Sequence, residues 1–178
     1  MGLQMEQGLI EVYTGNSKGK STAAFGLALR AVGHGFHVYI IQFMKGSSYY
    51  GELASFKRLE PECQLEHFGL KKWVKMGEAK AEDIAEAKRG LARAEELMLS
   101  GEWDIIILDE INNALCFELL TTGEVLDFLA KKPDKVELVL TGRNAPLEII
   151  AAAQLVTEMV EVKHPFQQGI PARKGVEY

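Results

Sequence analysis

The chain has 178 residues, 47% of them hydrophobic and 25% charged, which is typical of a globular protein and excludes a fibrous or wholly disordered one. The net charge of −5 argues against non-specific nucleic-acid binding, because such binding depends on Lys and Arg that neutralise phosphates. The two cysteines, Cys63 and Cys116, lack C-x-x-C spacing, and no apolar run approaches the roughly 20 residues that cross a bilayer. We therefore expect a single cytoplasmic domain over residues 1–178, with no membrane or nucleic-acid partner.

Apolar runs rich in β-branched residues alternate with helical stretches along the chain. They predict strands at 9–13, 38–43, 103–108, 136–140 and 155–162, with a shorter strand at 64–68. Between these strands, the spacing of apolar residues and the helix start and stop signals predict helices at 21–32, 81–99, around 126–129 and at 146–153. This alternation indicates an α/β fold with a mostly parallel central sheet, flanked by helices on both faces. From about 163 the Pro and Gly content predicts an irregular C-terminal tail.

The first motif that points to chemistry is TGNSKGKST, at 14–22, between the first strand and the first helix. It nearly matches the phosphate-binding loop G-x-x-x-x-G-K-[ST], whose backbone N–H groups converge on an anion at a helix N-terminus. Lys20 would add a full positive charge, and Ser21 would offer its hydroxyl to Mg²⁺. The alternative is a glycine-rich turn with a capping Ser, but the strand before the motif and the helix after it favour a phosphate loop.

Thr14 departs from the motif, which has Gly at this position. A β-branched residue strongly disfavours positive φ. We therefore expect the chain to leave the strand in an extended conformation and to turn only at Gly15.

A second motif, WDIIILDE at 103–110, is an apolar strand that ends in two carboxylates. This pattern is used to hold Mg²⁺ or a water bound to it. The alternative is that Asp109 and Glu110 cap a helix. Arg143, in TGRN at 141–144, also follows a strand, at the edge where ligands bind in such sheets, and is either a phosphate or base contact or an ordinary surface residue.

The residues alone leave several classes of function open. The sequence offers no Ser-His-Asp or Cys-His arrangement and no base placed to activate a hydroxyl acceptor. One class is a small kinase or ATPase that uses ATP in the ordinary polarity, although an Arg-rich lid stretch is absent. Another is a nucleotide-sensing protein that binds ATP without turnover.

An ordered set of motifs, from about Leu9 to Tyr178, resembles the corrinoid adenosyltransferases of the CobA, CobO or BtuR type. The set comprises VYTGNSKGKSTAAFGLALRAVGHG at 12–35, QFMKG at 42–46, GE at 51–52, ILDE at 107–110, LTGR at 140–143 and VKHPFQQGIPARKGVEY at 162–178. The phosphate loop alone would be weak evidence, whereas this set in this order is specific.

The resemblance implies a P-loop NTPase fold of the RecA-like type and a homodimer. The implied enzyme transfers the 5′-deoxyadenosyl group of MgATP to Co(I) of cob(I)yrinic acid a,c-diamide or cob(I)alamin and releases triphosphate. It also implies a partner electron donor that reduces Co(II), and an ATP that lies reversed on the loop with its ribose C5′ toward the corrinoid. This chemistry agrees with the absence of a base, because Co(I) is itself the nucleophile.

The resemblance also implies site residues, position by position. The implied ATP-binding residues are Thr14, Gly15, Asn16, Ser17, Lys18, Gly19, Lys20, Ser21, Thr22 and Arg30. Asn16 and Arg30 would lie near the ribose. Lys20 and Glu110 are the implied catalytic residues. Ser21 and Glu110 are the implied Mg²⁺ ligands, with Asp109 as a further candidate.

The segment that corresponds to the corrinoid-binding residues of the family departs from the family pattern. The type member of the family carries Gly-Phe-x-Trp, whereas this chain reads GLKKW at 69–73, with Leu70 in place of Phe and one extra residue before Trp73. The resemblance implies that Leu70 and Trp73 bind the corrinoid, with Leu70 supplying apolar bulk.

Overall fold

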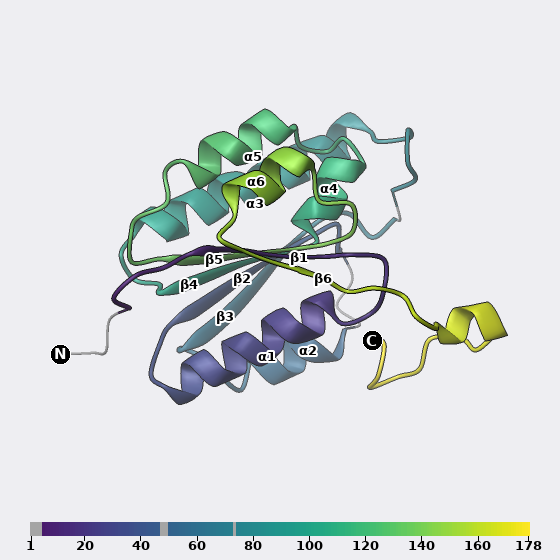
Figure 1. Ribbon diagram of the computed structural model, residues 1–178, viewed down its shortest axis with the longest axis horizontal. Coiled ribbons are helices and arrows are strands. Elements are labelled where there is room, and N and C mark those ends of the chain that lie inside the picture. Colours follow the sequence, from purple (N-terminus) through teal and green to yellow (C-terminus); the bar gives the residue numbers. More distant parts are fainter. Residues whose placement is uncertain (1–4, 47–49, 73) are drawn as a thin grey trace.

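A computed structural model describes residues 5–46, 50–72 and 74–178. Its centre is a six-stranded sheet in which every neighbouring pair of strands is parallel (Figure 1). The strands are β1 (Ile10–Thr14), β2 (Val38–Phe43), β3 (Cys63–Phe68), β4 (Ile105–Asp109), β5 (Glu137–Thr141) and β6 (Leu155–Glu158). They lie in the order β3-β2-β4-β5-β1-β6. The predicted α/β fold with a parallel sheet is confirmed.

Helices cover both faces of the sheet, as the apolar strands require (Figure 1). One face carries α1 (Lys20–Gly33) and α2 (Gly51–Phe56). The other face carries α3 (Ala81–Leu99), α4 (Ile111–Cys116), α5 (Thr122–Leu129) and α6 (Leu147–Ala152). A short 3₁₀ helix, η1 (Pro165–Gln168), lies in the predicted irregular tail. Within the described ranges, no helix is both long and apolar enough to cross a membrane.

The alternation of side chains along β2 divides the core into two layers. Every residue of β2 is buried. Val38 and Ile40 pack in the layer beneath α1, whose small residues, Ala24 and Ala28 among them, let the helix lie close to the sheet. The intervening β2 residues, including Ile41, belong to the larger layer under α3–α6. This burial makes the sheet a firm support for the loops at its edge.

Four strands deliver polar or glycine-rich segments to one edge of the sheet. Because the strands are parallel, the carboxyl ends of β1, β2, β4 and β5 lie at the same edge. The phosphate loop follows β1, and Asp109 and Thr141 are the last residues of β4 and β5. This is the edge at which open α/β sheets bind ligands.

The predicted elements differ from the structure mainly in length. The last strand ends at Glu158 instead of at 162, because Met159 turns toward the phosphate loop: its N–H donates to the Thr14 carbonyl, and its own carbonyl accepts from the Ser17 N–H. Helices α2 and α4 were not predicted. Each has only six residues, too few to show a helical period.

Candidate active site

The phosphate loop leaves β1 as the sequence predicts. Thr14 is the last residue of the strand and is buried, and the first turn comes at Gly15, with φ of 96°. Gly19, directly before α1, has φ of 121°. A Cβ on Gly15 would lie 2.5 Å from the carbonyl oxygen of Met159. Both the backbone conformation and the contact with Met159 therefore require glycine at position 15.

The Lys20 side chain bonds to the backbone of the phosphate loop. Its Nζ donates to the carbonyl oxygens of Gly15, at 2.8 Å, and Ser17, at 2.7 Å. Burial lowers the pKa of Lys20, and the nearby carboxylate of Glu110 works against that shift. The loop thus places a cation at the N-terminus of α1, where the helix dipole also favours an anion.

A cavity of about 740 Å³ opens between the phosphate loop, the ends of β2 and β4, and the C-terminal tail. This volume is in the range that holds a nucleotide-sized ligand. Its polar lining includes Lys20, Ser21, Lys45, Glu52, Glu110, Asn113, Arg143 and His164. Its apolar lining includes Phe25, Phe43, Tyr50, Val74 and Phe117. The tail contributes residues 175–178, so this segment belongs to the site.

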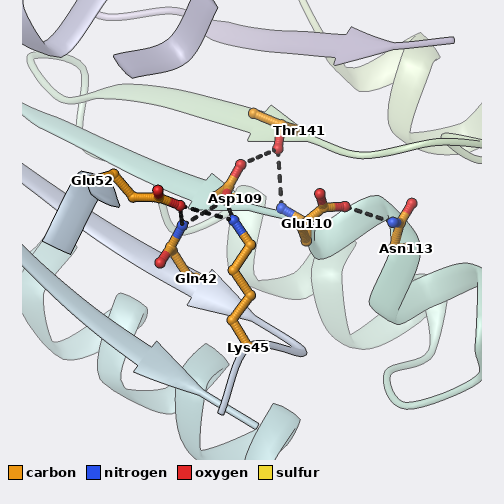
Figure 2. A network of polar contacts seen from close by, with 7 residues as sticks. All are labelled: Gln42, Lys45, Glu52, Asp109, Glu110, Asn113 and Thr141. Carbon is orange, nitrogen blue, oxygen red and sulfur yellow. Dashed lines mark hydrogen bonds and ion pairs between the residues drawn. The ribbon is translucent and has the colours of Figure 1, made fainter. Parts of the chain in front are cut away.

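Glu110 faces the cavity from a left-handed backbone conformation, with φ of 66°. Its N–H donates to the Thr141 hydroxyl oxygen at 3.0 Å, and the Asn113 amide donates to its carboxylate at 2.5 Å (Figure 2). Burial and the adjacent Asp109 carboxylate raise the pKa of Glu110. Strained backbone of this kind persists where surrounding bonds fix it, and is common at functional sites.

Asp109 is turned the other way and is fully buried. Its carboxylate accepts from the Thr141 hydroxyl at 2.8 Å, from the Gln42 amide at 3.0 Å and from Lys45 Nζ at 3.1 Å (Figure 2). Burial alone would raise the pKa of Asp109, but Lys45 and these hydrogen bonds hold it below its ordinary value. The two adjacent carboxylates therefore have different surroundings: Asp109 is enclosed and Glu110 lines the cavity.

The oxygen donors at this edge fit a magnesium ion that arrives with a nucleotide. Ser21 and Glu110 line the same cavity, and hydroxyl and carboxylate oxygens are the ligands that Mg²⁺ takes. In the described part of the chain, no three His, Cys, Asp or Glu side chains gather into a metal site. Mg²⁺ commonly binds through one or two carboxylates together with substrate phosphates, and two protein donors beside a phosphate loop suit that arrangement.

The structure brings together only part of the residues that the resemblance implied. Residues 17–22, Lys20 and Ser21 among them, line the cavity with Glu110. Asn16 is exposed at the loop, and Arg30 is exposed in the last turn of α1; neither lines the cavity. Leu70 lines a separate recess of about 10 Å³ beside Phe68. Trp73 lies outside the described residues.

Other residues of the site were missed as functional candidates, although they stood in quoted motifs or close behind them. Lys45 and Glu52 belong to the QFMKG and GE motifs, and Asn113 follows Glu110 by three positions. For Lys45 the available signal was a charged residue two positions after a buried strand, because such residues reach the carboxyl edge of a parallel sheet. The pairing of Lys45 with Asp109 depends on β2 and β4 being neighbours, which the sequence did not reveal.

Comparisons with known proteins show the family to which the chain belongs. A family model described as ATP:corrinoid adenosyltransferase BtuR/CobO/CobP matches residues 6–178. A corrinoid adenosyltransferase of Sinorhizobium sp is 40% identical, over 97% of this chain and 81% of the relative. Those of Pseudomonas aeruginosa and Escherichia coli K12 are 39% and 35% identical, over 97% and 98% of this chain and 85% and 88% of the relatives.

Among solved structures, a KaiC-like protein of the archaeon Pyrococcus horikoshii OT3 has a TM-score of 0.61 at 16% identity, over 86% of this chain and 73% of that one. This likeness supports the P-loop, RecA-like fold and says nothing of the reaction. The relatives and the family model cover nearly the full length. The chain therefore belongs to the ATP:corrinoid adenosyltransferase family BtuR/CobO/CobP.

Proposed function

We propose that the chain transfers the 5′-deoxyadenosyl group of MgATP to Co(I) of a reduced corrinoid and releases triphosphate. The observation that carries the proposal is the convergence of Lys20, Ser21 and Glu110 on one cavity at the carboxyl edge of the sheet. That cavity is lined both by the cationic phosphate loop and by aromatic side chains, including Phe25 and Phe117. It thus suits a triphosphate together with flat organic groups.

In the proposed reaction the cobalt–carbon bond forms as the bond between C5′ and its phosphate oxygen breaks, and the electron pair of the broken bond leaves with triphosphate. Attack at a saturated carbon needs no proton transfer. The chain's task is to align the reactants and to neutralise the departing charge. Lys20 supplies charge from the phosphate loop, and Arg143, which lines the cavity from the loop after β5, supplies a second cation.

We assign the triphosphate to the loop over 15–22, with ATP reversed so that C5′ points toward the corrinoid. Ser21 and Glu110 would hold Mg²⁺, which supplies further neutralisation of the triphosphate when it is bound. Asn113, by donating to the Glu110 carboxylate, would fix the orientation of that ligand. Arg30 and Asn16 stay candidates for the ribose side, and Leu70 and Trp73 for the corrinoid side.

We propose a homodimer that uses the edge strand β6. All four residues of β6 are exposed, and the exposed apolar side chains Val160 and Val162 follow it along the chain. An uncovered parallel edge strand with apolar side chains can pair with a second copy of the strand.

Two further parts of the proposal concern the surroundings of the enzyme. A separate electron donor would reduce Co(II). The free thiols of Cys63 and Cys116 suit a cytoplasmic setting.

One assay separates adenosyl transfer from its alternatives. The chain would be given MgATP and a corrinoid that has been chemically reduced to Co(I), and the product followed by the visible absorbance of the cobalt–carbon bond. We expect an adenosylated corrinoid, and expect Glu110→Gln to lower its rate strongly. ADP together with a phosphorylated acceptor would favour a kinase, and ATP binding without any product would favour a sensor.

A further inference from the structure

Lys45 stands between three carboxylates at the carboxyl edge of the sheet. Its Nζ lies 3.1 Å from Asp109 Oδ2 and 3.5 Å from Glu52 Oε1, and Glu110 follows Asp109 directly (Figure 2). The Lys45 side chain is 16% exposed, and that of Asp109 is fully buried. The described residues thus place an ion pair in an enclosed position beside the magnesium ligands that we propose.

Donors from the protein already occupy both oxygens of the Asp109 carboxylate. A carboxylate offers about four acceptor positions on its two oxygens. Thr141 donates to Oδ1, and Gln42 and Lys45 both donate to Oδ2. Glu110, by contrast, lines the cavity and receives the Asn113 amide on one oxygen.

From this arrangement we propose that Lys45 is a positioning residue: it keeps Asp109 engaged as an enclosed ion pair, so that Glu110 alone presents a carboxylate to the metal–nucleotide complex. The inference rests on the proposed function and adds a division of labour between the two adjacent acids. It also assigns a purpose to a lysine that neither the phosphate loop nor the acidic motif contains.

A direct contact between Lys45 and the triphosphate is the competing role, since Lys45 also lines the cavity. The surroundings of its ammonium group favour positioning. It already has two carboxylate partners, and the Tyr50 ring centroid lies 5.1 Å away. Turning toward a phosphate would leave Asp109 buried without its counter-charge, which is costly in a protein interior.

The test uses Mn²⁺ as a spectroscopic substitute for Mg²⁺ and measures free and bound Mn²⁺ by electron paramagnetic resonance, with and without ATP. The variants are Lys45→Met and the double variant Lys45→Met with Asp109→Asn. The double variant removes both charges of the pair. It is tolerable because the Gln42 amide, whose buried Oε1 has no hydrogen-bond partner, can rotate to accept from the new Asn.

For Lys45→Met we expect Mn²⁺ binding without ATP to tighten about 10-fold, because Asp109 is released, and Mn–ATP binding to weaken about 10-fold. The double variant should bind Mn–ATP within about threefold of the unmodified chain, because neither the pair nor a freed carboxylate remains. The ATP KM should follow the Mn–ATP affinity in each variant.

Two results would overturn the inference. If Lys45→Met binds Mn²⁺ without ATP as the unmodified chain does, Lys45 does not prevent Asp109 from binding the metal. If the double variant keeps the full Mn–ATP defect, Lys45 contacts the phosphates directly; this comparison holds even where the single variant fails to fold. If the unmodified chain binds no Mn–ATP, the proposed function is overturned as well. If the unmodified chain and both variants bind Mn²⁺ and Mn–ATP equally well, only the role of Lys45 is overturned.

Discussion

The hydroxyl oxygen of Thr14 accepts a hydrogen bond from the backbone N–H of Ala145, 3.2 Å away, across 131 positions of sequence. This bond joins the end of β1 to the segment after β5, which also carries Arg143. A glycine at position 14 has no side chain to make it. The departure from the phosphate-loop motif therefore couples two loops that border one cavity.

Thr14→Val should uncouple these loops at nearly constant side-chain volume. The Ala145 N–H would lose its acceptor, and we expect the free energy of unfolding to fall by about 1 kcal/mol. The KM for ATP should rise, because Arg143 is less well positioned. Thr14→Ser keeps the hydroxyl and is the matched control. Denaturant unfolding and steady-state kinetics measure both effects, and equal behaviour of Val and Ser would show that the bond is unimportant.

Gly15→Ala should damage the loop, because position 15 has φ of 96° and a Cβ there would lie 2.5 Å from Met159. Gly26→Ala is the matched control on the exposed face of α1, where a new Cβ meets nothing within 4 Å. We expect Gly26→Ala to stabilise the chain by about 0.5–1 kcal/mol and Gly15→Ala to destabilise it by more than about 1 kcal/mol. Thermal unfolding of the two variants decides whether the strained turn is required.

Lys20→Met should abolish productive ATP binding, because the phosphate loop loses the cation that lies at its centre. We expect kcat/KM for ATP to fall by at least about 100-fold. Lys57→Met, at an exposed position that does not line the cavity, should be close to neutral. Calorimetric titration with MgATP distinguishes lost binding from lost chemistry, and retention of ATP affinity in Lys20→Met would contradict the assigned role.

The fold could be predicted from the sequence better than the contacts within the site. Strands β2, β4 and β5 could be predicted because they are short, largely apolar and buried at every residue. The phosphate loop could be predicted because its glycines and lysine stand close together in one short motif. The burial of Asp109 among polar partners could not be predicted from the sequence. It depends on Gln42, in the neighbouring strand β2, and on Lys45, just after that strand, both of which donate to the Asp109 carboxylate. A linear pattern likewise gave no sign that residues 175–178 return to the cavity.

The buried carboxyl group of Glu137, which lies near Glu11, gives a pH prediction away from the site. Burial raises the pKa of Glu137 to about 7, the Leu9 N–H opposes this shift, and Glu11 adds to it. The unfolded chain then ionises this group at lower pH than the folded chain does. The stability contributed by the protonated form is therefore present below the ordinary pKa of Glu and is lost as pH rises toward about 7.

Glu137→Gln should remove this dependence, because the amide stays neutral and still accepts from the Leu9 N–H. Above pH 7 we expect the variant to be more stable than the unmodified chain by about 1 kcal/mol, offset in part by the lost attraction to Lys132. Below pH 4 the two should converge. Unfolding by urea at a series of pH values measures this, and a constant difference across the range would contradict the assignment.

The phosphate product tests the proposed reaction most directly. Phosphorus NMR of a reaction containing the chain, MgATP and a Co(I) corrinoid reports which bond of ATP is broken. Transfer of the adenosyl group predicts intact triphosphate, in a one-to-one ratio with the cobalt–carbon bonds formed. ADP with inorganic phosphate or a phosphorylated acceptor, and no triphosphate, would contradict adenosyl transfer.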